Sequence, residues 1–131
     1  MDVAIGVSRP RQDALQQAGE VVPAPIVIRG LIDTGASGTC VDPSVLNALN
    51  LSPTGVASVL TPTTGHTPVN TEQYDVSVTL LSPRLTWSFG SLAVMRSELE
   101  VQGIQALIGR DVLGHCMLVY NGSMNMFTLA F

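Results

Sequence analysis

Apolar and polar side chains alternate along residues 74–81, and this alternation limits the possible fold more than any other feature of the chain. The apolar members are Tyr74, Val76, Val78 and Leu80, and each residue between them is polar. A period of two residues is typical of a β-strand with one buried face. Elsewhere, short apolar runs are separated by Gly, Pro, Ser and Thr, as in chains with many strands and turns. We therefore predict a single, mostly β domain over residues 1–131.

Shorter patterns predict the remaining elements. Further strands are expected over residues 3–7, 26–32, 39–41, 85–94, 106–109, 117–120 and 126–131. Gly30 predicts a turn or bulge within the second of these, and Asn121-Gly122 predicts the turn of a C-terminal hairpin.

Two short helices are also expected. One begins at Asp42, where Asp-Pro supplies an N-cap and a first-turn proline, and ends near Asn50; the other covers residues 110–115. Residues 8–20 are predicted to form a loop. Residues 1–23 as a whole are a candidate N-terminal extension or precursor segment.

Charge and hydropathy argue against two classes of partner. Six basic residues, all arginines, are scattered between Arg9 and Arg110 against ten acidic residues, so no cationic stripe can neutralise phosphates and we expect no nucleic-acid partner. The charge-free stretches contain polar turns, whereas a membrane span needs about twenty mainly apolar residues, so we expect no membrane partner. Nothing resembles a secretory signal, and the cytoplasm is the expected location, for a free chain or one cut from a longer or membrane-anchored precursor.

Cysteine and histidine are too few for a zinc framework. The two cysteines, Cys40 and Cys116, and the two histidines, His66 and His115, lack paired-ligand spacing. We therefore expect no metal and no other cofactor. A disulfide between the cysteines is possible, but two free thiols are the favoured interpretation in a chain without a signal sequence.

The segment Asp33-Thr34-Gly35-Ala36-Ser37 places a carboxylate directly after an apolar run. Desolvation penalises a charge at such a position, which makes sense if a tight turn at Gly35 presents Asp33 on the floor of a cleft. Asp-Thr-Gly is also common in ordinary turns, so these three residues alone leave a purely structural role open.

A second motif lies near the C-terminus, where Ala106-Leu107-Ile108-Gly109-Arg110-Asp111-Val112-Leu113 leads an apolar strand into a helical turn. Together with Leu31-Ile32-Asp33-Thr34-Gly35-Ala36-Ser37, and in this order, it resembles the two signatures of the retropepsin-like aspartic proteases, in the branch found in cellular and bacterial proteins as well as in retroviruses. The resemblance covers residues 24–131. It implies a retropepsin-like acid-protease fold with closed-barrel-like sheets and one or two short helices, forming one subunit of a homodimer.

The resemblance also implies roles for the residues of the first motif. Asp33 would be the catalytic carboxylate. Thr34 would lock two such loops together across a dimer, and Gly35 would supply the turn and a carbonyl that faces substrate. Ala36 and Ser37 would line the substrate cleft near its edge.

Other matching residues would support or cover that loop. Gly109 would pack closely behind it and Arg110 would anchor it from the side, although viral members often have an acidic partner for this arginine where Ser37 stands. Gly65 falls 32 residues after Asp33, about where the family has its flap. The flap tip would then comprise Thr64, Gly65 and His66, the alternative being a polar surface loop.

The Asp-Thr-Gly motif has no second copy in the chain. Because aspartic-protease chemistry needs two carboxylates that share a proton, the second must come from another chain in a C2 homodimer. The predicted function is an aspartic endopeptidase that hydrolyses extended polypeptides through a water activated by two Asp33 side chains. The alternatives are a catalytically silent dimerisation or peptide-binding module with the same fold, and a plain β domain with a coincidental motif.

Apolar alternation at the C-terminus has two interpretations. Phe127, Leu129 and Phe131 predict a strand that lies either in a dimer interface or at an ordinary sheet edge. Trp87 and Phe89 alternate in the same way, and for them we predict strand packing.

Overall fold

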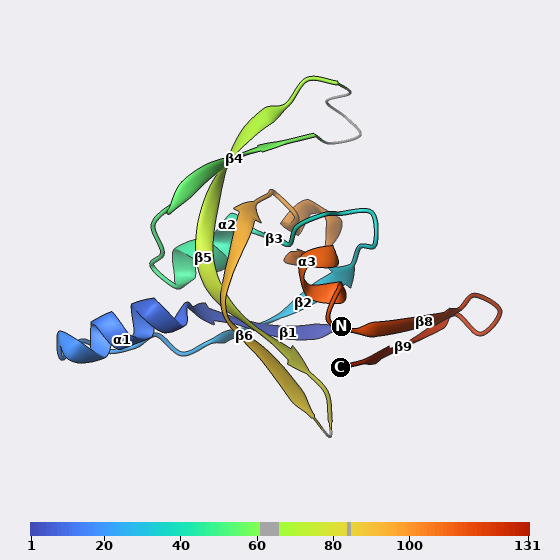
Figure 1. Cartoon of the computed structure of the whole chain (residues 1–131), viewed down its shortest axis with the longest axis horizontal. Coiled ribbons are helices and arrows are strands. Elements are labelled where there is room, and N and C mark those ends of the chain that lie inside the picture. The colour runs from blue at the N-terminus through green and yellow to red at the C-terminus, as the bar shows by residue number, and fades with distance from the viewer. Residues whose placement is uncertain (61–65, 84) are drawn as a thin grey trace.

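The computed structural model describes residues 1–60, 66–83 and 85–131 (Figure 1). Within this part, the main sheet has the strand order β1-β2-β7-β3-β6-β5-β4, and β1 also pairs with β5, so that six strands close into a barrel. The strands are β1 (Asp2–Val7), β2 (Ile26–Ile32), β3 (Cys40–Val41), β4 (Gly55–Val59), β5 (Val69–Leu81), β6 (Thr86–Arg96) and β7 (Ala106–Ile108). The prediction of a mostly β chain with closed-barrel-like sheets is confirmed.

Alternating side chains of β5 fill the barrel as the sequence predicts. Val76, Val78 and Leu80 are fully buried, and they pack with residues of β1 such as Val3 and Ile5. The strand is longer than predicted because its first half, from residue 69, pairs with β4 beyond the barrel. β5 therefore belongs to the core at one end and to the β4–β5 hairpin at the other.

The predicted break at Gly30 is wrong, because β2 runs without interruption through it. A side chain at this position would begin 3.1 Å from the Ile108 side chain of the neighbouring strand β7. Gly30 thus allows close packing inside the barrel and does not mark a turn. The parallel pairing of β2 with β7 brings the ends of both strands to the same edge of the sheet.

The predicted loop over residues 8–20 is also wrong, because α1 (Arg9–Gln17) forms there. The pattern hid this helix because only Leu15 is buried, so no apolar stripe repeats. One local signal favours it nevertheless: a proline stands in the first turn, after the N-cap residue Ser8, whose side chain makes no capping hydrogen bond. Gly19, with φ of 70°, ends it, since the Gly19 N–H bonds the carbonyl of Gln16 and the next N–H that of Leu15.

The other helices are short. α2 (Pro43–Ala48) begins after the predicted N-cap Asp42, and α3 (Arg110–Leu113) follows β7. A single 3₁₀ turn covers Glu100–Gln102. With α1 there are three α-helices in the described ranges, one more than predicted. None of these helices has the length and apolar character needed to cross a bilayer.

The C-terminal hairpin stands apart from the barrel (Figure 1). It consists of β8 (Met117–Asn121) and β9 (Met126–Ala130), and residues 122–125 form its loop, slightly beyond the predicted Asn121-Gly122 turn. We call residues 117–130 the arm. Cys116, directly before it, is a free thiol, as is Cys40.

Candidate active site

The loop that carries Asp33 begins where β2 ends. The Asp33 N–H donates to the carbonyl of Ile108, which continues the β2–β7 pairing into the loop. One carboxylate oxygen, Oδ1, accepts the N–H of Gly35 at 2.9 Å and that of Ala36 at 3.2 Å. The other oxygen has no hydrogen bond to a described residue. The loop therefore fixes the carboxylate through one of its two oxygens.

Gly109, from the second motif, lies directly behind this loop. A Cβ at this position would meet the carbonyl carbon and oxygen of Gly38 at 2.5 Å, so only glycine fits without displacing backbone. The next residue, Arg110, donates its N–H to the carbonyl of Ala36 at 3.0 Å. The two sequence motifs, more than seventy residues apart, thus meet through backbone contacts.

Sequence reasoning missed the side chains that join the two motifs. Thr39 is fully buried, and both its N–H and its hydroxyl donate to the carboxylate of Asp111 at 2.8 Å. The Thr39 hydroxyl also accepts the N–H of Gly109. The sequence offered two signals for this contact. Thr39 is a polar residue directly before the apolar pair of β3, and Asp111 is an acidic residue within the second motif.

A groove of about 740 Å³ opens beside the loop. The loop contributes Asp33, Gly35, Ala36 and Ser37, and the facing side comes from the β4–β5 hairpin. The hairpin residues in the lining are Ser58, Val59, Leu60, Val69 and Thr71. Asp33 therefore lies at a groove between its own loop and the β4–β5 hairpin.

Cys40, Met95 and Leu107 also line the groove, as do Arg96 and Ser97. Cys40 on β3 is opposite Leu107 on one side and Met95 on the other, so the three form a row across three strands. Burial, followed by the negative charges of Asp111 and Asp33, raises the pKa of the Cys40 thiol to about 11. This thiol is therefore protonated at neutral pH, so that Cys40, Met95 and Leu107 together form an uncharged part of the groove lining.

The remaining predicted residues lie elsewhere. Thr64 and Gly65 fall outside the described residues, and His66 is exposed and does not line the groove. The Arg110 side chain is exposed, and the two ion pairs among the described residues, Arg9–Asp13 and Arg96–Glu98, do not include it.

Thr34 points to a second hollow, of about 370 Å³, on the side of the arm. Its lining includes Met1, Leu31 and Ile32 near the end of β2, and Leu118, Tyr120 and Phe127 from the arm. Thr34 and Leu31 are exposed. The Asp33 loop thus adjoins the groove on one side and an apolar surface on the other.

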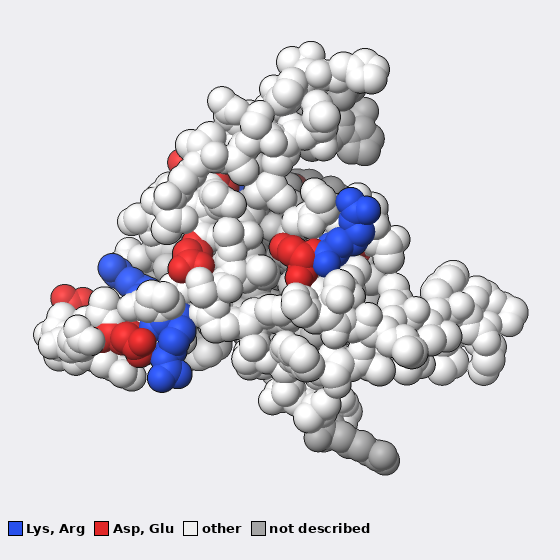
Figure 2. Space-filling model, in the orientation of Figure 1, with Lys and Arg blue, Asp and Glu red and all other residues white. Residues whose placement is uncertain are grey.

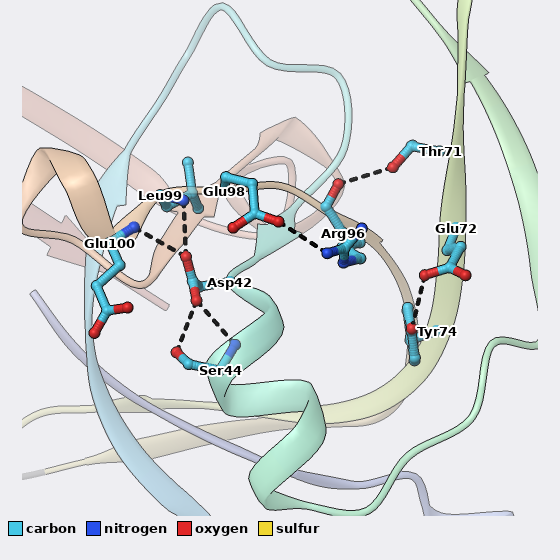
Figure 3. Close-up of polar contacts among 9 residues, drawn as sticks. All are labelled: Asp42, Ser44, Thr71, Glu72, Tyr74, Arg96, Glu98, Leu99 and Glu100. Carbon is cyan, nitrogen blue, oxygen red and sulfur yellow. Dashed lines mark hydrogen bonds and ion pairs between the residues drawn. The ribbon is translucent and has the colours of Figure 1, made fainter.

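Asp42, the N-cap of α2, joins the start of this helix to the segment around Leu99 and Glu100 (Figure 3). Its buried carboxylate accepts the N–H and hydroxyl of Ser44 and the N–H groups of Leu99 and Glu100. Burial by itself raises the pKa of Asp42, but these hydrogen bonds outweigh it and lower the pKa to about 2. The ionised side chain holds the segment that follows Ser97, a groove-lining residue.

Among the described residues, no group of three or more His, Cys, Asp or Glu side chains could hold a metal ion. Comparison of the sequence with protein-family models and with curated proteins found no match.

Proposed function

We propose that the chain is one subunit of a homodimeric aspartic endopeptidase with a retropepsin-like fold, in which the Asp33 side chains of two copies form the catalytic pair. The observation that carries this proposal is the position of Asp33: its carboxylate is fixed through Oδ1 by two backbone N–H groups and lies at the edge of a groove under a hairpin. The meeting of the two motifs through Gly109 and Arg110 supports the same fold.

The chemistry divides between the two carboxyl groups. Two carboxyls about 3 Å apart do not both ionise, so one Asp33 acts as base and the other as acid. The ionised group takes a proton from a water held between them, and the protonated group donates to the scissile carbonyl oxygen. The resulting intermediate is a tetrahedral gem-diol. The Asp33 that took the proton of water then donates it to the amide nitrogen while the other Asp33 takes a proton from a gem-diol hydroxyl. The C–N bond breaks, the amine leaves, and no acyl-enzyme forms. Activity is expected on the acid side of neutral.

An extended polypeptide is the substrate that suits this groove. Hairpin and loop lie on opposite sides, as in sites where a peptide binds as an added strand. Cys40, Met95 and Leu107 offer an apolar surface beside Asp33, which favours apolar side chains near the cleaved bond. The β4–β5 hairpin would act as the flap that excludes bulk water from the reacting water.

The second copy follows from the chemistry and from the surface beside Thr34. One chain supplies one Asp-Thr-Gly, and an isologous C2 contact through the Thr34 side of the loop would bring two such loops together. The apolar hollow between β2 and the arm lies on this side.

Cleavage of a mixed peptide library between about pH 4 and pH 7 tests the proposal. Wild type is compared with Asp33→Asn, and with Asp13→Asn as a matched control on the exposed face of α1. Pepstatin is added in parallel. Cleavage by wild type and Asp13→Asn, together with its loss in Asp33→Asn, is the expected result, and sensitivity to pepstatin would add support for a carboxylate pair.

Two outcomes would contradict the proposal. Undiminished cleavage by Asp33→Asn would exclude this carboxylate as the catalytic group. A stable wild-type dimer that cleaves nothing over the whole pH range would favour the catalytically silent dimerisation or peptide-binding module.

A further inference from the structure

Two residues that flank the arm, His115 and Phe131, contact a pair of aromatic side chains on β6. Phe131, directly after β9, lies edge-on to Trp87 with ring centroids 6.4 Å apart. His115, shortly before β8, lies edge-on to Phe89 at 5.4 Å. Trp87 and Phe89 are themselves 6.3 Å apart. We call these four residues the aromatic cluster.

The cluster fixes a hairpin that has little other support. The arm forms its own two-stranded sheet, and an isolated pair of strands is at best marginally stable in water. Leu129 and Phe131 pack against the barrel core, whereas most of the arm is exposed. The direction of the arm relative to the barrel therefore depends on how its two ends are held.

The exposed part of the arm is apolar and uncharged. Residues 112–131 contain no Asp, Glu, Lys or Arg, and Figure 2 shows the arm without charged side chains. Its large exposed side chains are Met117, Val119, Tyr120, Met124, Met126 and Phe127, each between 48% and 70% exposed. They occur on both faces of the hairpin, because neighbours such as Val119 and Tyr120 point to opposite sides. Water is an unfavourable environment for such a surface, which is typical of an interaction site.

A second copy of this chain is the occupant that fits this surface best. The hollow lined by Leu118, Tyr120 and Phe127 of the arm continues to Thr34, next to the single carboxylate that the proposed reaction must pair with another. In a C2 dimer each copy presents the same surface, so an apolar arm meets an apolar partner. A partner of another sequence would cover the arm without supplying the second Asp33.

We propose that Trp87 and Phe89 are positioning residues for dimerisation: they hold both ends of the arm, through Phe131 and His115, so that its apolar surface meets the second copy beside Thr34. This inference rests on the proposed function and names residues outside the Asp33 loop on which assembly of the site depends. Neither aromatic residue lines the groove, so their effect on cleavage passes through the dimer.

Sedimentation velocity over a range of protein concentrations measures the dimer dissociation constant directly. Phe131→Ala, which removes the ring at one end of the arm, and Trp87→Leu are expected to raise this constant at least tenfold. Phe131→Leu, which keeps an apolar side chain, should lie between wild type and Phe131→Ala. Leu85→Ala is the matched control, because Leu85 is an exposed apolar residue just before β6 and outside the aromatic cluster. It should shift the constant less than twofold.

A kinetic readout separates positioning from other roles. Specific activity is measured against protein concentration: the half-maximal concentration should rise at least tenfold in Phe131→Ala, while the plateau at high concentration stays at the wild-type value. A lowered plateau, or a dissociation constant no different from that of Leu85→Ala, would overturn the inference.

The inference and the proposed function fail in different ways. Sedimentation needs no cleavage, so a dimer weakened by Phe131→Ala in a protein that cleaves nothing would support the inference and contradict the protease. Cleavage that is unaffected by Phe131→Ala at all concentrations would support the protease and contradict the inference. A wild type that stays monomeric at every concentration would overturn both. If Trp87→Leu does not fold, Phe131→Ala at the end of the arm decides the question.

Discussion

The side chain and N–H of Thr39 both donate to the carboxylate of Asp111, 72 residues away in sequence, at 2.8 Å. This pair joins the segment after the Asp33 loop to the first turn of α3. Because Thr39 is fully buried, its polar groups have little access to water and depend on Asp111. The geometry of the candidate site therefore rests on a contact behind it.

Asp111→Ala is expected to lower the free energy of unfolding by about 1–3 kcal/mol, because it leaves the buried N–H and hydroxyl of Thr39 without an acceptor. Thr39→Val should have an effect of similar size. In a double-mutant cycle, the loss of stability in the double variant should be smaller than the sum of the two single losses, because both substitutions remove the same interaction. Urea unfolding provides the measurement, with Thr79→Val as control, because the Thr79 hydroxyl bonds Ser88 at an exposed position. Strict additivity would argue that the pair does not interact.

Gly109→Ala should destabilise the protein by about 1–3 kcal/mol, because the added methyl group begins 2.5 Å from the Gly38 backbone and the loop must move. Thermal unfolding measures the loss. Gly90→Ala is a matched control without a clash, since the nearest neighbour of the added methyl group, the Cβ of Arg9, would lie at an ordinary van der Waals distance of 3.5 Å. The two substitutions should differ clearly, and equal effects would contradict the close approach of the two motifs.

Local patterns in the sequence were sufficient to predict most strands. Alternation around Val76 and Val78 reports which face is buried, and Asp42-Pro43 reports the start of a helix, because both depend on neighbouring residues. The helix α1 was not predicted because it lacks such a pattern: Leu15 is its one buried residue, so no apolar stripe repeats along it.

The candidate site was predictable only in part. Asp33 and its loop form a continuous motif, and the structure places Gly35 and Ala36 as donors to the carboxylate. The contact between Thr39 and Asp111 depends on strands that meet only in the folded barrel, so no local pattern contains it. The same is true of the aromatic contact between Trp87 and Phe131.

Asp42 should make stability depend on pH. Its pKa is lowered from 3.8 to about 2 in the folded state, so the folded protein binds fewer protons than the unfolded chain between these values. The resulting stabilisation, about 2 kcal/mol, is fully present above about pH 4 and is lost as the pH falls towards 2.

Urea unfolding of wild type and Asp42→Asn between pH 2 and 6 measures this dependence. The variant should be less stable than wild type near pH 6, because the amide NH₂ that replaces one carboxylate oxygen cannot accept the hydrogen bonds made there. Those are the bonds from Leu99 and Glu100 to one oxygen, or those from Ser44 to the other. The difference should shrink as the pH falls. Asp13→Asn, on the surface of α1, should follow wild type, and a constant difference across the range would contradict the assignment.

Cys40 provides a chemical test of the geometry around Asp33. With its pKa raised to about 11, the Cys40 thiol should react with iodoacetamide at pH 8 about 100-fold more slowly than a free cysteine, because the thiolate is the reactive form. Asp33→Asn removes one of the two negative charges that raise this pKa and should speed the reaction. The rate is followed by mass spectrometry in a Cys116→Ser background, so that one thiol is present. Asp13→Asn should leave the rate unchanged. An equal rate in Asp33→Asn would contradict the effect of the Asp33 carboxylate on the pKa of Cys40, and with it their proximity in the groove.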